Sequence, residues 1–168
     1  TEKQSGIDPT EMLEGVFSRA ADSESIWVHI ENFNDYRKWT AKLSTSSLNN
    51  KDQEIRIWLD YVSPKLSIRR DKEYDEWFKK KAAFEVNKAF QSMRVRVHYQ
   101  FHRALYRLQG MVWTGETCVN IWLVQNGFSF YLLNSDKRPS EHQDFLDAEQ
   151  LAKSQQIGLW KPAIQNAK

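Results

Sequence analysis

Residues 118–160 constrain the fold of this chain more than any other part of the sequence. Gly127 stands where a left-handed residue ends a helix, and a second helical repeat begins near Ser140. An aromatic segment and a polar loop lie between the two, and Gly-Leu-Trp at 158–160 closes the stretch. The residues spaced for one face of the first helix are Val119, Leu123 and Val124. The predicted order is therefore helix, strand, loop and helix.

This order resembles the C-terminal part of the staphylococcal-nuclease-like (thermonuclease) domain family, which carries a V-N-x-x-L-V-x-x-G run and a closing G-x-W. Residues 119–127 match the run, and Gly158 and Trp160 match the closing motif. The second helix supplies the other matches, which are Leu146, Ala148, Glu149, Ala152 and Lys153. The resemblance implies an α+β fold, a five-stranded OB-fold-like β-barrel with packed helices.

Similarity to the family continues upstream, so that it covers most of residues 13–161. Residues 16–28 resemble the first hairpin, with 22–25 on its D-G-D-T positions, and residues 103–106 resemble the opening of a later strand, G-R-x-L-A-Y-V. A helix and then an alternating strand are expected between residues 79 and 109. The helix is expected to bury in part Phe78, Ala82, Phe84 and Phe90.

The bulk properties agree with one soluble domain. A chain of 168 residues is long enough for one core, and we expect a polar lead at 1–12, the domain at 13–161 and a tail at 162–168. No apolar run reaches the roughly 18 residues of a membrane helix, so no membrane partner is expected. The single cysteine, Cys118, excludes an internal disulfide and a cysteine-based zinc site; the compartment stays open, with an intracellular one favoured.

Positive charge is concentrated in the middle of the chain. The net charge is +2, but residues 51–110 hold fourteen Lys or Arg against eight Asp or Glu, a balance of +6. An OB-type sheet with basic and aromatic side chains commonly holds single-stranded nucleic acid, RNA or DNA. The candidate residues are Arg94, Arg96, Tyr99, Arg103, Arg107, Lys79, Lys80 and Lys81. The alternative explanation is an ordinary solvated sheet face.

The resemblance also implies a phosphodiesterase site with calcium carboxylates, a glutamate base and two arginines, and much of this set is replaced. Aligning Ser63-Pro64 with the family's Thr-Pro puts Val62 at the second calcium carboxylate and Lys65 at the general base. A valine cannot bind calcium and a lysine repels it. We therefore interpret the domain as a degenerate nuclease fold with no catalytic residues and no cofactor.

The positions that remain leave a second function open. Glu24 stands on the first calcium carboxylate, and Arg103 matches the second arginine. Arg56 misses the first arginine by one residue, and a β-bulge would re-aim it together with Asp60. The favoured function is a non-catalytic binding or scaffolding module, for instance in an RNA-handling complex. The alternative is a calcium-dependent phosphodiesterase with a rearranged site made of Glu24, Arg56, Asp60 and Arg103.

Residues 31–53 form an insertion relative to the family, between the second and third strands. Aromatic residues recur there at helical spacing, which predicts a short amphipathic helix with Phe33, Tyr36 and Trp39 on its stripe. Exposed aromatic anchors in an added element are favoured contacts for a protein partner. The alternative is that the stripe closes one end of the sheet.

Overall fold

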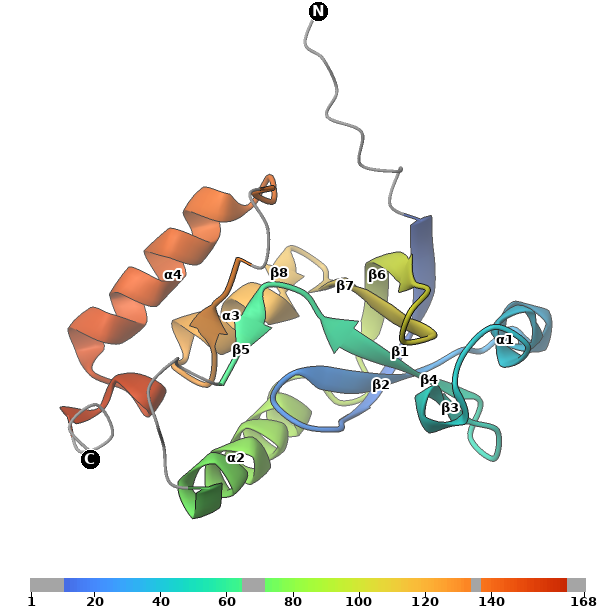
Figure 1. Ribbon diagram of the computed structural model, residues 1–168, viewed down its shortest axis with the longest axis horizontal. Coiled ribbons are helices and arrows are strands. Elements are labelled where there is room, and N and C mark those ends of the chain that lie inside the picture. The colour runs from blue at the N-terminus through green and yellow to red at the C-terminus, as the bar shows by residue number, and fades with distance from the viewer. Residues whose placement is uncertain (1–10, 65–71, 134–136, 163–168) are drawn as a thin grey trace, which may run out of the picture.

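The computed structural model describes residues 11–64, 72–133 and 137–162, and the side chains of residues 72–79 lie outside the description. The fold is mixed α+β: a twisted sheet with helices packed around it (Figure 1). No helix in the described ranges is long and apolar enough to cross a bilayer.

Five strands of the sheet form a ring, as the resemblance predicted. They are β1 (Glu11–Ala20), β2 (Ser25–His29), β4 (Glu54–Leu59), β7 (Arg107–Thr114) and β6 (Arg94–His102). Each pairs with the next in that order, and β6 pairs with β1, so the ring is closed. All the pairs are antiparallel except β4 with β7, which is parallel. The alternating strand expected near Arg94 is β6.

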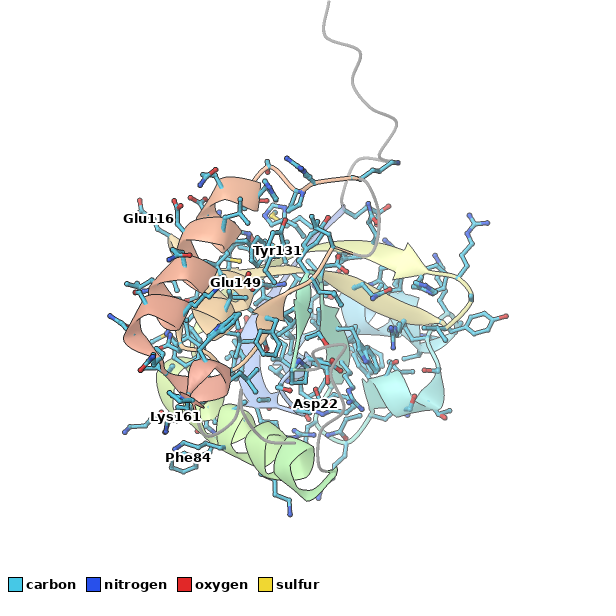
Figure 2. The ribbon with its side chains drawn as sticks, turned by 60° about the vertical axis from the view of Figure 1, so that its left-hand side comes forward. Asp22, Phe84, Glu116, Tyr131, Glu149 and Lys161 are labelled. Carbon is cyan, nitrogen blue, oxygen red and sulfur yellow. The ribbon has the colours of Figure 1, made fainter. Side chains whose placement is uncertain are left out.

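Four short strands complete the β structure. The strand β3 (Leu48–Asn49) is added to β4, and β8 (Thr117–Cys118) is added to β7. The strands β5 (Val62–Ser63) and β9 (Phe130–Tyr131) pair with each other in a second sheet. The backbone N–H of Tyr131 donates to Glu149 Oε2 at 2.8 Å, which ties β9 to the last helix (Figure 2).

The core lies inside the ring because apolar residues alternate along each strand. Each strand turns one set of side chains inward; on β4 these are Ile55, Ile57 and Leu59, all buried. The side chains between them, Arg56 and Trp58, face outward and are half-buried. This alternation places the polar residues of β4, β6 and β7 on the outer surface of the ring.

The C-terminal order is as predicted. The helix α3 (Val119–Gln125) buries its apolar face, α4 (His142–Gln155) follows, and a 3₁₀ turn η2 (Gly158–Trp160) ends the domain. Gly127 has φ +72° and accepts a hydrogen bond from the N–H of Leu159 at 2.7 Å. A Cβ on Gly127 would collide with the carbonyl of Ile157, and a Cβ on Gly158 would collide with the carbonyl of Gly127. Both matched glycines are therefore required where these two backbone segments meet.

The long helix α2 (Lys72–Phe90) packs beside β1 with Ala82, Val86 and Phe90 buried. The prediction that Phe84 is partly buried there is wrong, because its side chain is 64% exposed and points away from the ring (Figure 2). Phe84 lies between the buried positions of the helical repeat, on the solvent side. Phe78 has no described side chain.

The insertion between β2 and β4 contains the predicted helix, α1 (Phe33–Thr40), followed by a 3₁₀ turn η1 (Thr45–Ser47). The side chain of Asn32 accepts hydrogen bonds from the N–H groups of Asn34 and Asp35, which begins the helix at its N-cap. Figure 1 places α1 to one side of the ring, on the side opposite α4.

Candidate functional site

The β1–β2 turn holds the first set of polar residues. Asp22 Oδ1 accepts from the N–H of Glu24 at 2.8 Å and from Ser25 Oγ at 3.0 Å, as a carboxylate that orders a turn does. Its other oxygen accepts from Arg56 Nη2 at 3.2 Å, and Arg56 Nε donates to Ser25 Oγ at 3.0 Å. The turn therefore holds Arg56, the first arginine that the sequence analysis singled out.

Two arginines flank one tryptophan on the outer face of the ring. The Cζ of Arg56 lies 4.5 Å from the Trp58 ring centroid, and the Cζ of Arg107 lies 4.8 Å from the same ring. Such contacts between guanidinium and indole are attractive. Burial lowers the pKa of Arg107, and the charge of Arg56 acts in the same direction, against Glu24 and Asp60. Within the described residues, Arg107 Nε has no hydrogen-bond partner.

Asp60 is the carboxylate beside Arg107. Burial raises its pKa to about 6, although the charges of Arg107 and His102 act in the opposite direction. Its backbone is fixed at both ends, because its N–H donates to the carbonyl of Gly110 at 3.0 Å and its carbonyl accepts from Asn120 Nδ2 at 2.9 Å. The backbone of Asp60 is thus held in place, and burial shifts the pKa of its carboxyl toward neutral pH.

Glu24 lies on the same side, where Ser63 Oγ donates to its Oε1 at 3.4 Å. The arginine cluster, which we define as Glu24, Arg56, Trp58, Asp60 and Arg107, therefore brings together three of the four residues of the alternative site. Arg103 is not among them, since it lies in the exposed turn between β6 and β7.

Arg107, which the sequence analysis placed with the nucleic-acid-binding residues, completes the cluster. One sequence signal points to it. Leu108, Gly110 and Val112 alternate inward on β7, so the side chain of Arg107 points outward. Arg107 directly precedes Leu108, which pairs with Ile57 in the middle of β4. The similarity of residues 103–106 to the family's strand opening placed the strand four residues too early.

The donor set of the cluster does not fit a calcium ion. Calcium takes six to eight oxygen ligands in proteins. Asp22 is already paired with Arg56, Asp60 lies against Arg107, and the side chain of Val62 is apolar and buried. Across residues 11–64, 72–133 and 137–162, no three His, Cys, Asp or Glu side chains are placed to share an ion. Lys65 lies outside the described residues.

A second feature is a large groove beside the cluster. Its volume is about 1880 Å³, and it runs over the outer face of β6 and β7 between α1 and residues 137–141. Six basic and three acidic side chains line it: Lys38, Lys42, Arg96, Arg103, Lys137 and Arg138 against Glu11, Asp60 and Glu141. Aromatic and imidazole rings lie between them, including Tyr106, Trp113 and His98. The groove is therefore basic and aromatic.

The predicted nucleic-acid-binding residues are divided among several places. Arg96 and Arg103 line the groove. Tyr99 is buried, and its hydroxyl donates to Glu11 Oε2 at 2.8 Å, which together with burial raises its pKa. Arg94 pairs with Glu31 at 3.1 Å, away from the groove lining.

Lys80 and Lys81 are exposed on α2, which contributes no residue to the groove lining, and the side chain of Lys79 is outside the description.

The three aromatic residues predicted to bind a protein partner through the insertion differ in burial. Tyr36 and Trp39 are buried, so their rings are not on the surface, whereas Phe33 is 57% exposed. The hydroxyl of Tyr36 donates to Asn50 Oδ1 at 2.7 Å.

A comparison with known protein families finds one match. The family model described as SNase, staphylococcal nuclease homologue, matches residues 62–162. No curated protein sequence matches the chain. The matched range includes β5, α2, β6, β7 and the complete C-terminal order of helices from which the resemblance was first inferred.

Proposed function

Because this chain belongs to the staphylococcal nuclease homologue family, we propose that it is a non-catalytic member that binds single-stranded nucleic acid in the groove. The observation that carries the proposal is the lining of the groove, with twice as many basic as acidic side chains and rings between them. Basic grooves with aromatic platforms bind single strands on OB folds without base-specific contacts. An RNA-handling complex is a setting in which such a module would serve as a scaffold.

The groove offers groups for both the phosphates and the bases of a single strand. Arg96 and Arg103 are exposed guanidinium groups that suit phosphate oxygens. Tyr106, in the β6–β7 turn, has 59% of its surface exposed and offers a ring for stacking an unpaired base. The positive φ of Tyr106, +47°, fixes the backbone from which this ring projects.

The arginine cluster supports a non-catalytic assignment. Arg56 is engaged by Asp22 and Ser25, and both arginines are stacked on Trp58, so their charges are held within the protein. Transition-state stabilisation requires cationic donors that point at the position of the reacting phosphate. Val62 stands where the family has a calcium-binding carboxylate. Among the described residues, no three His, Cys, Asp or Glu side chains are placed to bind an ion together.

One observation favours the alternative, a calcium-dependent phosphodiesterase. Asp60 has a pKa of about 6, and a carboxylate that titrates near neutral pH is suited to general base catalysis. In this alternative Glu24, Asp60, Arg56 and Arg107 would form the rearranged site. Protein binding by the insertion is a further alternative, and it would rest on the exposed ring of Phe33.

The proposal is tested with fluorescein-labelled oligonucleotides of twelve uridines or twelve thymidines, and a matching duplex. We expect single strands to bind with an affinity that falls as salt rises, and Arg96→Glu with Arg103→Glu to weaken binding at least about tenfold. The control is Lys51→Glu with Lys88→Glu, which makes the same change in net charge away from the groove. Equal binding by the groove variant and the wild type would contradict the proposal.

Cleavage is measured on the same oligonucleotides with and without calcium. The proposal predicts intact oligonucleotides under conditions where binding is saturated. Cleavage that requires calcium and is lost in Glu24→Gln and in Asp60→Asn would establish the alternative function instead.

A further inference from the structure

We propose that the inserted helix α1 supplies a second phosphate-binding wall, so that the groove grips a single strand from both sides. The wall is made of Lys38 and Lys42, which line the groove together with Arg96 and Arg103. This inference rests on the proposed function and adds to it the part of the site that the insertion builds.

Trp39 anchors the wall in the core. Its ring is 5% exposed and packs edge-on against Tyr99, with the centroids 5.4 Å apart and the planes at 83°. It also lies 6.3 Å from the ring of Phe101. Because Tyr99 and Phe101 belong to β6, α1 is fixed directly against the strand that carries Arg96.

The same tryptophan positions both lysines. Lys38 and Lys42 are four residues apart, and the Nζ atom of each lies 5.4 Å from the Trp39 ring centroid. Contacts of ammonium groups with an indole ring are attractive and leave the positive charge in place. Neither lysine forms an ion pair within the described residues, and both are exposed. Two ammonium groups are thus held at the groove without a neutralising carboxylate.

A backbone hydrogen bond joins the segment after α1 to the β6–β7 turn. The N–H of Ser44, just after α1, donates to the carbonyl of Tyr106 at 2.9 Å, and Tyr106 lies in the turn that carries Arg103. The groove volume, about 1880 Å³, is larger than the roughly 300–1000 Å³ of small-ligand sites. A large groove with cations on both walls fits a polymer of phosphates.

The chemistry of α1 favours nucleic acid over a protein partner. The two large rings of its stripe that would anchor a protein, Tyr36 and Trp39, point into the core. The exposed positions near the groove carry charge instead. A surface of lysines without an apolar centre is suited to a polyanion and lacks the buried aromatic contacts typical of protein interfaces.

The test compares Lys38→Glu with Lys42→Glu, the control Lys51→Glu with Lys88→Glu, and the groove variant Arg96→Glu with Arg103→Glu. The probe is the labelled twelve-uridine strand, titrated at several salt concentrations. We expect the α1 variant to lose at least about tenfold in affinity. Because a single strand releases about 0.7 counterions per phosphate contact, Lys38→Gln with Lys42→Gln should reduce the salt slope by about 1.4. Near-UV circular dichroism checks that Trp39 stays packed.

Each outcome separates the two ideas. If the α1 variants keep the wild-type affinity and slope while the Arg96 and Arg103 variant loses binding, the second wall is overturned and the proposed function stands. If the control pair loses as much affinity as the α1 pair, net charge explains the effect and the second wall is again overturned. If the Arg96 and Arg103 variant binds like the wild type, both are overturned.

Discussion

The arginine cluster and the groove lie side by side on the outer face of one sheet, but they differ in whether their positive charges have a carboxylate nearby. In the cluster, Arg56 is paired with Asp22 at 3.2 Å, and Arg107 lies near Asp60 and Glu24. In the groove, Lys38 and Lys42 form no ion pair among residues 11–64, 72–133 and 137–162, and the Nζ atom of each lies 5.4 Å from the Trp39 ring centroid. The arginines of the cluster therefore lie beside carboxylates, whereas these two lysines of the groove do not.

The comparison shows that two neighbouring parts of one sheet differ in how far their positive charges are compensated. Charges that are neutralised inside a protein contribute little attraction to a polyanion, because each is already compensated nearby. Uncompensated charges that line a concave surface attract one. The added helix α1 increases the second kind of charge without altering the first.

The largest effect is expected at Asn120, which joins Asp60 of the cluster to β7. Asn120 is fully buried; its Nδ2 donates to the carbonyls of Asp60 and Gly110, and its Oδ1 accepts from the N–H of Val112. Asn120→Ala leaves these groups unpaired, so the free energy of unfolding should fall by about 2–4 kcal/mol. Urea unfolding measures the change.

The matched control for this prediction is Asn126→Ala, at the end of α3. Asn126 makes one partly buried hydrogen bond, from its Nδ2 to the carbonyl of Trp122 at 2.9 Å. Its removal should cost about 1 kcal/mol or less. Equal losses in the two variants would mean that Asn120 does not join the cluster to β7.

Next in size is the effect of pH through Asp60. Its folded pKa, about 6, is above the ordinary value of 3.8, so the folded protein binds more protons than the unfolded chain between these values. The free energy of unfolding therefore falls as pH rises from about 4 to 6 and stays lower above that range. Asp60→Asn should remove this fall and raise stability at pH 7.5 by roughly 1–3 kcal/mol.

The check on Asp60 is urea unfolding of the wild type and the variant at pH 4 and pH 7.5. The difference between the two proteins should be small at pH 4 and large at pH 7.5. A constant difference at both values would show that Asp60 is not the buried carboxyl of the cluster.

A smaller effect separates the two regions by binding. Arg56→Ala removes a guanidinium that is already paired, so the affinity for the twelve-uridine strand should stay within about twofold. Arg96→Ala removes a groove guanidinium, whose Nη2 contacts only the carbonyl of Gly115 among the described groups, and should weaken binding about threefold or more. The comparison between cluster and groove fails if Arg56→Ala has the greater effect in fluorescence anisotropy.

The smallest effect is expected at Phe33, on the outer side of α1. Its side chain is 57% exposed, so Phe33→Ser should change the free energy of unfolding by less than about 0.5 kcal/mol. The affinity for the single strand should also be unchanged, as measured in the same titration. A clear loss of nucleic-acid affinity would extend the groove to this side of the helix.

The sequence by itself determined the elements and the family. The spacing of Val119, Leu123 and Val124 with Gly127 specifies α3 and its end, because helical periodicity and a left-handed glycine are local properties. The pair Gly127 and Gly158 was visible as two matched positions. The helix α1 was likewise predicted from its aromatic spacing, since a repeat of three and four residues is local too.

Only the tertiary structure decided which residues meet. Periodicity tells which side chains share a face, but not which face is covered by a distant segment, and so Tyr36 and Trp39 were compatible with either a surface or a core position. The parallel pairing of β4 with β7 brings Arg107 beside Trp58, although residues 60–106 separate these strands in the sequence. Long-range pairing of this kind, rather than any local pattern, separates the arginine cluster from the groove.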